Sequence, residues 1–313
     1  MKIAVVCGGT SPEREVSLNS GKAVAEALRD AGHDVLLCDV TKPRDFVAEW
    51  KETKADGVFV AMHGGWGEDG RLQTCLEAFG IPYTGSGPSA CLYAMDKHVS
   101  RCLMASCGVL VPDGYSKERG SAVGTSDITA LKKYGTLVTK PNGGGSSTNV
   151  SFVTSADELV NGLEVAWSEG ELALVERYIP GREVTVPVWE KEDGEVIALP
   201  AIDIRPKDGF YNYKNKYTHG CTEYICPAKF PKKTYDRLNE MAVAAHKALG
   251  CRVYSRVDFR VTEDDDIYAL EVNTAPGMTS TSLVPKAAQS YGLSFAEFLE
   301  SVIRVSFSIQ RSF

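Results

Sequence analysis

Short apolar runs alternate with helical patterns over the first 87 residues of the chain. The apolar runs are KIAVVCGG, DVLLCDV and DGVFVAMHGG. Between the first two, apolar side chains recur at helical spacing over residues 13–31, and Gly32 ends the pattern. Strands that alternate with helices predict an open parallel α/β sheet, in which ligands bind beyond the carboxyl ends of the strands. The segments CGGTSPE and HGGWGEDG fall at those ends.

The middle of the chain mixes strands and helices, whereas the last third consists mainly of strands. We expect a single helix over residues 89–107, then a glycine loop, NGGGSSTN, between the strands TLVTKP and VSFV. After residue 181 the strand patterns are EVTVPVW, VIALPAIDI and TEYICPA, followed by a helix over residues 235–249. The predicted fold is therefore α/β, with domains at residues 1–87, 88–180 and 181–313.

Composition and charge narrow the class of protein. The 313 residues are 43% hydrophobic and 24% charged, and this length favours two or three packed domains. A net charge of −7 argues against nucleic acid as a partner, because phosphate binding requires a basic face. MKIAVVCGG lacks the features of a secretory signal, no apolar run is long enough to span a bilayer, and the cysteines show no metal-binding spacing. We expect a cytoplasmic protein without a membrane partner.

The first candidate for chemistry is a hairpin formed by VYSRVDFRV and IYALEVN. A four-residue loop at residues 263–266 would place Asp258 opposite Glu271, and Arg256 opposite Asn273, on one face. Opposed carboxylates repel each other unless a cation intervenes, and Asp, Glu and Asn oxygens suit Mg²⁺. The alternative is a solvated hairpin face with scattered charges.

The second candidate is the segment TKPNGGGSSTN, which places Lys140 at a strand end before three glycines. Glycine backbones can approach phosphate closely and cradle it with N–H groups, although a flexible hairpin tip is the simpler interpretation. Lys97 lies on a helix, where a lone lysine is normally exposed to solvent. Glu176 and Glu183 lie around a turn, where a carboxylate can hold a ribose or an amine, although an exposed glutamate is the commoner case. CGGTSPE lacks the G-x-G-x-x-G fingerprint, which argues against a dehydrogenase.

Eight segments together resemble the D-alanine–D-alanine ligase family of ATP-grasp enzymes. They follow one another through nearly the whole chain: GGTSPEREVSLNSG, HGGWGEDGRLQ, PYTGSGPSA with MDK, KPNGGGSS, VERYIPGREVTV, YNYKNKYTHGCTEYICPA, SRVDF and EVNTAPGMTSTSLVP. The resemblance implies an N-terminal α/β domain followed by a two-part ATP-grasp fold that holds ATP.

The resemblance assigns nucleotide and metal roles by position. The resemblance implies that the phosphates are bound by Lys97, Lys140, Ser147 and the loop residue Lys216. It implies that Glu176 and Ile179 bind the adenine and that Glu183 binds the ribose. Two Mg²⁺ ions, with Mn²⁺ as an alternative, fall on Asp258, Glu271 and Asn273.

The resemblance also assigns residues around two D-alanines. Glu13 and His63 match the contacts of the first D-alanine, and Ser282 and Leu283 those of the second carboxylate. A hydrogen-bonded link joins Glu13, Ser146 and Tyr217, while Arg256 and the Gly277 N–H stabilise an oxyanion. Simpler roles are a structural His63, a packing Tyr217, an Arg256 that neutralises Asp258, and a Ser282 that caps a helix.

The implied activity is ATP-dependent ligation of two D-alanines through an acyl phosphate, for peptidoglycan precursors. Tyr217 favours an amine acceptor over D-lactate, and D-serine remains an alternative acceptor. A nucleotide-binding protein without turnover is the alternative from another class. The resemblance also implies a homodimer through the N-terminal region.

The chain departs from the family's sequence after the glycine loop, where Thr148–Asn149 stand in place of valine and glycine. This departure predicts a positive φ at Asn149.

Overall fold

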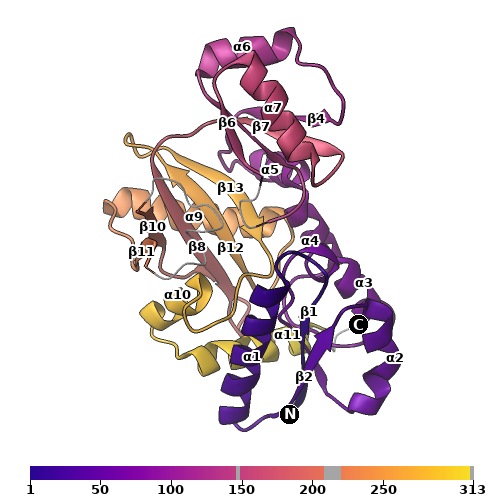
Figure 1. Ribbon diagram of the computed structural model, residues 1–313. Coiled ribbons are helices and arrows are strands. Elements are labelled where there is room, and N and C mark those ends of the chain that lie inside the picture. The colour runs from indigo at the N-terminus through magenta and orange to yellow at the C-terminus, as the bar shows by residue number, and fades with distance from the viewer. Residues whose placement is uncertain (146–148, 208–219, 311–313) are drawn as a thin grey trace.

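The computed structural model describes residues 1–145, 149–207 and 220–310. It contains three sheets, one above another in Figure 1. The first is the predicted parallel sheet, in the order β2-β1-β3. Its strands and surrounding helices are β1 (Lys2–Gly8), α1 (Arg14–Asp30), β2 (Asp34–Val40), α2 (Pro43–Thr53), β3 (Gly57–Val60), η1 (Gly65–Gly67) and α3 (Arg71–Ala78).

The second sheet is antiparallel and lies at the top of Figure 1 with α6 and α7. Its order is β4-β7-β5-β6, and the glycine loop connects β5 to β6. A separate core lies between this sheet and its two helices. The elements are β4 (Gly114–Glu118), α6 (Thr125–Tyr134), β5 (Leu137–Pro141), β6 (Ser151–Val153), α7 (Ala156–Trp167) and β7 (Leu172–Arg177).

The third sheet occupies the middle of the molecule, and α9 packs against it. Its order is β11-β10-β8-β12-β13, with β9 paired to β8. The predicted strand VIALPAIDI is divided into two, and the predicted helix over 235–249 begins three residues earlier. The elements are β8 (Arg182–Glu190), β9 (Val196–Ala198), β10 (Ile202–Pro206), β11 (Thr222–Ile225), α9 (Lys232–Ala248), β12 (Tyr254–Val261) and β13 (Ile267–Asn273).

The prediction of a single helix over residues 89–107 is wrong, because this segment forms two helices, α4 (Pro88–Met95) and α5 (Lys97–Ser106). Asp96 has extended geometry and caps α5 by accepting a hydrogen bond from the Val99 N–H at 2.9 Å. The N–H groups of Lys97 and His98 donate to Asn142, at the start of the glycine loop. The break therefore joins α5 to that loop.

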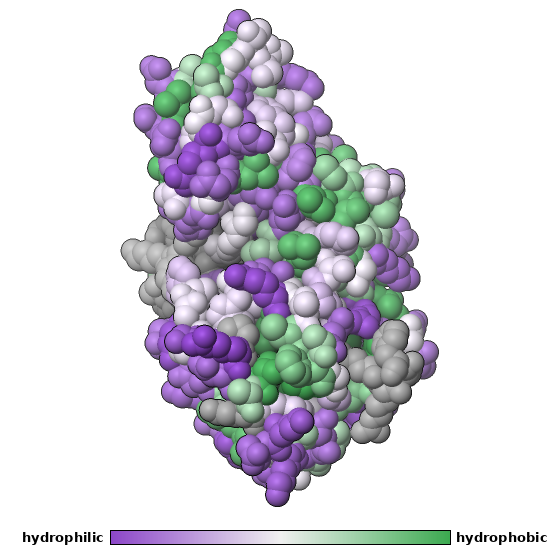
Figure 2. All heavy atoms as spheres, turned by 90° about the vertical axis from the view of Figure 1, so that its right-hand side faces the viewer, coloured by the Kyte–Doolittle hydropathy of each residue, from purple (hydrophilic) through white to green (hydrophobic). Residues whose placement is uncertain are grey.

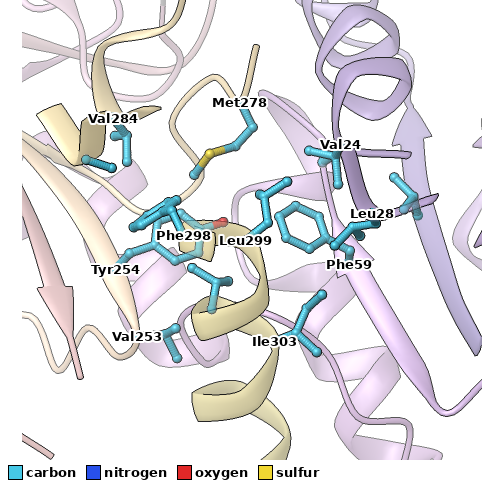
Figure 3. Packing of buried hydrophobic residues seen from close by; sticks show 14 of the residues in the cluster. Val24, Leu28, Phe59, Val253, Tyr254, Met278, Val284, Phe298, Leu299 and Ile303 are labelled. Atoms are coloured by element: carbon cyan, nitrogen blue, oxygen red, sulfur yellow. The ribbon is translucent and has the colours of Figure 1, made fainter. Parts of the chain in front are cut away.

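Of the last two helices, α10 (Leu283–Tyr291) packs against β8, and α11 (Phe295–Gln310) packs against α1 of the N-terminal region. Figure 3 shows Leu299 and Ile303 of α11 beside Val24, Leu28 and Phe59 of the N-terminal region. One core therefore joins the beginning and the end of the chain. Among the described residues, no helix has the length and apolar character needed to cross a membrane.

Candidate active site

The β12–β13 hairpin brings the predicted metal ligands together. Asp258 pairs with Glu271 and Arg256 pairs with Asn273, as the sequence predicts. The apolar residues that alternate with them along β12 pack toward α9 and α5 in a buried core. The opposite face of the strand consequently carries Arg256, Asp258 and Arg260 toward the site.

The predicted hairpin loop is one residue too short. Val261 pairs with Ile267, so the turn comprises residues 262–266 instead of 263–266. A β-bulge then leaves Leu270 as an extra residue on β13 and restores the predicted register at Glu271. Because of the bulge, the consecutive residues Leu270 and Glu271 both line the same pocket. Sequence reasoning missed Leu270, since no glycine or other signal marks the bulge.

The oxygen donors at this hairpin fit Mg²⁺ bound together with a nucleotide. Asp258 accepts hydrogen bonds from Thr185 at 2.5 Å and from Arg256 at 2.9 Å, and Glu271 lies 3.5 Å from the Lys97 ammonium. The described residues include no group of three or more His, Cys, Asp or Glu that could enclose a metal. Two carboxylates and the Asn273 amide are therefore an open set of hard oxygen ligands, which leaves coordination positions for phosphate and water.

A pocket between the two antiparallel sheets contains the predicted nucleotide residues. Lys140, the penultimate residue of β5, forms an ion pair with the buried Glu176 at 2.5 Å. Glu183 lies 3.7 Å from Arg260, and Ile179 is 2% exposed. The predicted residues that line this pocket are Lys97, Lys140, Glu176, Ile179, Glu183, Asp258 and Glu271.

Lys97 reaches the glycine loop from the first turn of α5. Its Nζ donates a hydrogen bond to the Gly144 carbonyl at 2.6 Å and lies near Glu271. The loop residue Asn142 in turn accepts the first two N–H groups of α5. A lysine that appears exposed in the sequence is therefore fixed beside both the glycine loop and the metal ligands.

A second pocket adjoins the first and contains the predicted amino-acid residues. The two pockets share the wall formed by Lys97, Gly144, Gly145, Asp258 and Glu271. Gly64 has a φ of 66°, which favours glycine, and a side chain there would meet the Glu13 carboxylate at 2.6 Å. The predicted residues that line this pocket are Glu13, His63, Arg256, Asn273, Gly277, Ser282 and Leu283.

His63 lines the pocket, but both of its ring nitrogens already have partners. Nε2 lies 2.8 Å from the Ser20 hydroxyl, and Nδ1 lies 2.8 Å from the Ala275 carbonyl. Burial lowers the pKa of His63 below its usual value, so the ring is neutral at pH 7. These contacts favour the structural alternative that the sequence left open.

Glu68 is a further ionisable group of this pocket, and sequence reasoning did not single it out. It is 9% exposed and accepts a hydrogen bond from the Gly64 N–H at 2.8 Å. Burial, with the nearby Glu13 carboxylate, raises the pKa of Glu68 to about 8. The motif GGWGEDG contains the residue, but only the tertiary structure shows that it is buried.

The contacts of Arg256 and Ser282 bear on the two simpler roles named for them, neutralisation of Asp258 and capping of a helix. Arg256 forms a bidentate pair with Asp258, at 2.9 and 2.7 Å, and so neutralises that carboxylate while it lines the pocket. Ser282 occupies the N-cap position of α10, but its side chain makes no capping hydrogen bond. Its hydroxyl bonds to Thr279 instead, and the N-terminus of α10 faces the pocket, where a carboxylate is favoured.

Four predicted site residues lie outside the described residues: Ser146, Ser147, Lys216 and Tyr217. Asn149 is described and has a φ of 53°, which confirms the predicted left-handed geometry. Its side-chain amide donates to Glu169 at 2.7 Å and to Ser168 at 3.2 Å. The residue that replaces the usual glycine is therefore tied to the end of α7.

Two antiparallel sheets that enclose a pocket of lysines, glycines and opposed carboxylates define the ATP-grasp class of ligases. Family comparisons match the D-ala D-ala ligase N-terminus at residues 2–56 and 48–86, and the D-ala D-ala ligase C-terminus at residues 113–304. The chain belongs to the D-alanine–D-alanine ligase family.

Individual relatives agree with this assignment. The D-alanine–D-alanine ligase of Syntrophotalea carbinolica is 45% identical over 302 residues, which cover 96% of this chain and 95% of that protein. The crystal structure of the Bacillus anthracis ligase complexed with ATP has a TM-score of 0.86 and 31% identity, and the match covers 100% of this chain and 99% of the other. The D-Ala:D-Ser ligase of Enterococcus faecalis has a TM-score of 0.82 and 30% identity, with 97% and 99% covered.

Proposed function

We propose that the protein joins two D-alanines to D-alanyl-D-alanine at the expense of ATP, for the synthesis of peptidoglycan precursors. The observation that carries this function is the shared wall between the two pockets, where a nucleotide phosphate and an amino-acid carboxylate can meet. The family and its relatives named for this reaction supply the substrates.

The first step requires a carboxylate to attack the γ-phosphate of ATP, which forms an acyl phosphate and ADP. Positioning and charge neutralisation dominate phosphoryl transfer, and Lys97 and Lys140, which line the pocket together with the glycine loop, supply positive charge. Glu13 holds the ammonium of the first D-alanine. Asp258, Glu271 and Asn273 would hold two Mg²⁺ ions, which neutralise the phosphate charge when bound.

In the second step, the amine of the second D-alanine attacks the acyl carbonyl, and phosphate leaves. The developing oxyanion faces Arg256 and the Gly277 N–H, both of which line the amino-acid pocket. The N-terminus of α10, with Ser282 and Leu283, receives the second carboxylate. Ser146, Ser147, Lys216 and Tyr217 retain the roles that the resemblance assigns to them.

We also propose that the protein binds small molecules and neither nucleic acid nor membrane, that it is cytoplasmic and that it forms a homodimer. The dimer would use the N-terminal region, where Phe79 is 67% exposed, together with the adjoining α4, where Leu92 and Tyr93 are 56% and 38% exposed. Figure 2 shows apolar side chains gathered in patches on the side of the molecule that faces right in Figure 1. Sedimentation equilibrium tests this assembly, and a mass of one chain at all concentrations would contradict it.

The test of function is phosphate release from ATP and Mg²⁺ with D-alanine, compared with D-serine, D-lactate and L-alanine. We expect release with D-alanine and a dipeptide product identified by mass spectrometry. Chelation of the metal should abolish release. Tight ATP binding without release, for any acceptor, would support the nucleotide-binding alternative and contradict the proposal.

The metal assignment predicts that Glu271→Gln lowers kcat/KM for MgATP by about 100-fold or more, because charge stabilisation by a metal is worth several kcal/mol. Its thermal midpoint should change little. The matched control is Glu240→Gln, at an exposed position of α9. Equal rates in the two variants would contradict the metal assignment.

A further inference from the structure

A buried chain of hydrogen bonds joins the N-terminal region to the loop that follows β13. Ser20 on α1 is fully buried, and its hydroxyl lies 2.8 Å from His63 Nε2. The other ring nitrogen, Nδ1, lies 2.8 Å from the Ala275 carbonyl. The Met278 N–H donates to the Ser20 hydroxyl at 3.2 Å. Two side chains from one region thus bind both ends of the segment 275–278.

The direction of each hydrogen bond follows from its partners. The Ala275 carbonyl can only accept, so Nδ1 of His63 carries the proton and donates. A neutral ring then has Nε2 as an acceptor, and the Ser20 O–H donates to it. The remaining lone pairs on Ser20 accept the Met278 N–H. The hydrogen bonds of this series therefore all run in one direction, from the Met278 N–H through Ser20 and His63 to the Ala275 carbonyl.

The segment held in this way has the sequence of a turn but not the geometry that the sequence favours. In a closed turn the Ala275 carbonyl would accept the Met278 N–H directly, and a central Pro-Gly pair favours type II, with positive φ at the glycine. Gly277 does not have a positive φ. Ser20 and His63 take the two groups that would close the turn.

We propose that Ser20 is a positioning residue for ligation, which acts through His63 and Met278 to fix the direction of the Gly277 N–H. The inference rests on the proposed function, in which that N–H stabilises the oxyanion of the second step. Packing supports it, since the Met278 side chain is 1% exposed and lies in the shared core near Val284 and Phe298 (Figure 3). Ser20 thus holds the Gly277–Met278 peptide through the Met278 N–H, and His63 holds the Ala275–Pro276 peptide through the Ala275 carbonyl. The Pro276–Gly277 peptide between them, which carries the Gly277 N–H, is therefore fixed from both sides.

The chain offers a matched control one helical turn away. Ser17 is also fully buried, accepts a hydrogen bond from the Gly8 N–H at 2.9 Å and donates to the Ala61 carbonyl at 2.8 Å. Its partners belong to the N-terminal sheet region alone. Ser17→Ala and Ser20→Ala therefore each remove one buried hydroxyl with two hydrogen-bond partners from the same helix. Only Ser20→Ala removes a contact with the segment 275–278, which carries the Gly277 N–H.

The experiment compares both variants of the full chain by thermal unfolding, by steady-state kinetics and by positional isotope exchange in ATP, which reports acyl phosphate formation before amine attack. We expect similar losses of thermal stability. Ser20→Ala should lower kcat by about 10- to 100-fold, because a displaced donor loses most of its effect, whereas KM for ATP and the isotope exchange change less than about threefold. Ser17→Ala should keep kcat within about twofold of the wild type.

Equal kcat values in the two variants, or isotope exchange that falls in parallel with ligation, would overturn the inference. Should Ser20→Ala fail to fold, Ser20→Cys retains a weaker donor at the same position. An intermediate kcat then supports the inference, and an unchanged kcat overturns it. A wild-type protein without D-alanine-dependent phosphate release contradicts the proposed function instead, so the two failures are distinguishable.

Discussion

At the scale of single residues, burial changes the charge of the amino-acid pocket. The neutral His63 and the mostly protonated Glu68 leave Glu13 and Arg256 as charged groups of its wall, beside Lys97, Asp258 and Glu271 of the wall shared with the nucleotide pocket. An ammonium can then bind beside Glu13 without a charged Glu68 competing for it. The residue types alone could not predict this, because the sequence contains the acid and the histidine but not the burial that shifts their pKa values.

Glu68 gives a pH-dependent prediction. Its pKa is about 8 in the folded protein and near 4.5 when unfolded, so the folded state binds the proton more tightly. The stabilisation by Glu68 is complete below about pH 4.5 and is lost as the pH rises through 8. Glu68→Gln keeps an acceptor for Gly64 and should flatten the fall in thermal midpoint between about pH 5 and 8.

The control for this pH series is Glu118→Gln, at an exposed strand end. It should leave the slope of thermal midpoint against pH unchanged. Equal slopes for wild type and Glu68→Gln would contradict the raised pKa.

At the scale of elements, local patterns predicted the strands well but not their irregularities. The opposed Asp258 and Glu271 follow from alternation along each strand, and the prediction holds because the longer turn and the bulge compensate each other. The broken helix before Lys97 had a local signal in the capping Asp96, but its other partner, Asn142, comes from a distant loop. Irregular elements depend on contacts that are remote in sequence, and here they carry the site.

The bulge predicts a selective defect in nucleotide binding. Because Leu270 faces the pocket instead of the core, Leu270→Ala should raise KM for ATP by roughly tenfold through lost apolar contact. KM for D-alanine and the thermal midpoint should change little. Isothermal titration with ATP checks the affinity, and Val160→Ala, at an exposed valine of α7, is the control. A variant with unchanged ATP affinity would remove Leu270 from the nucleotide site.

At the scale of the whole molecule, the cores do not follow the order of the chain. The predicted division at residues 87 and 180 stays a proposal, and the core that contains Phe59 of the first sheet also contains Leu299 and Ile303 of the last helix. The sequence FAEFLESVIRVSFSI shows a helix with a wide apolar face. The sequence does not show which sheet this helix face covers, because the face can pack against any apolar surface of suitable shape.

This arrangement predicts which parts unfold together. The second sheet has a core of its own, with α6 and α7. The N-terminal sheet contributes to two cores, one that it shares with the last helices and one that it forms with α2 and α3. Leu299 and Leu163 are both fully or almost fully buried leucines of helices, the first in the core shared with the last helices and the second in the core of the second sheet. Substitution of either by alanine should lower the local free energy of unfolding by about 2–5 kcal/mol.

The two substitutions should act on different segments in hydrogen exchange followed by mass spectrometry. Leu299→Ala should accelerate exchange in β1 and β3 as well as in α11, although β1 and α11 are nearly three hundred residues apart in sequence. Leu163→Ala should accelerate exchange in β5, β6 and β7 and leave β1 protected. Faster exchange confined to α11 in the first variant would show that the N-terminal sheet is stable without the last helix, and would contradict a shared core. If the expectation holds, the amino-acid pocket and the contacts of Ser20 depend on the end of the chain, since α1 packs against α11.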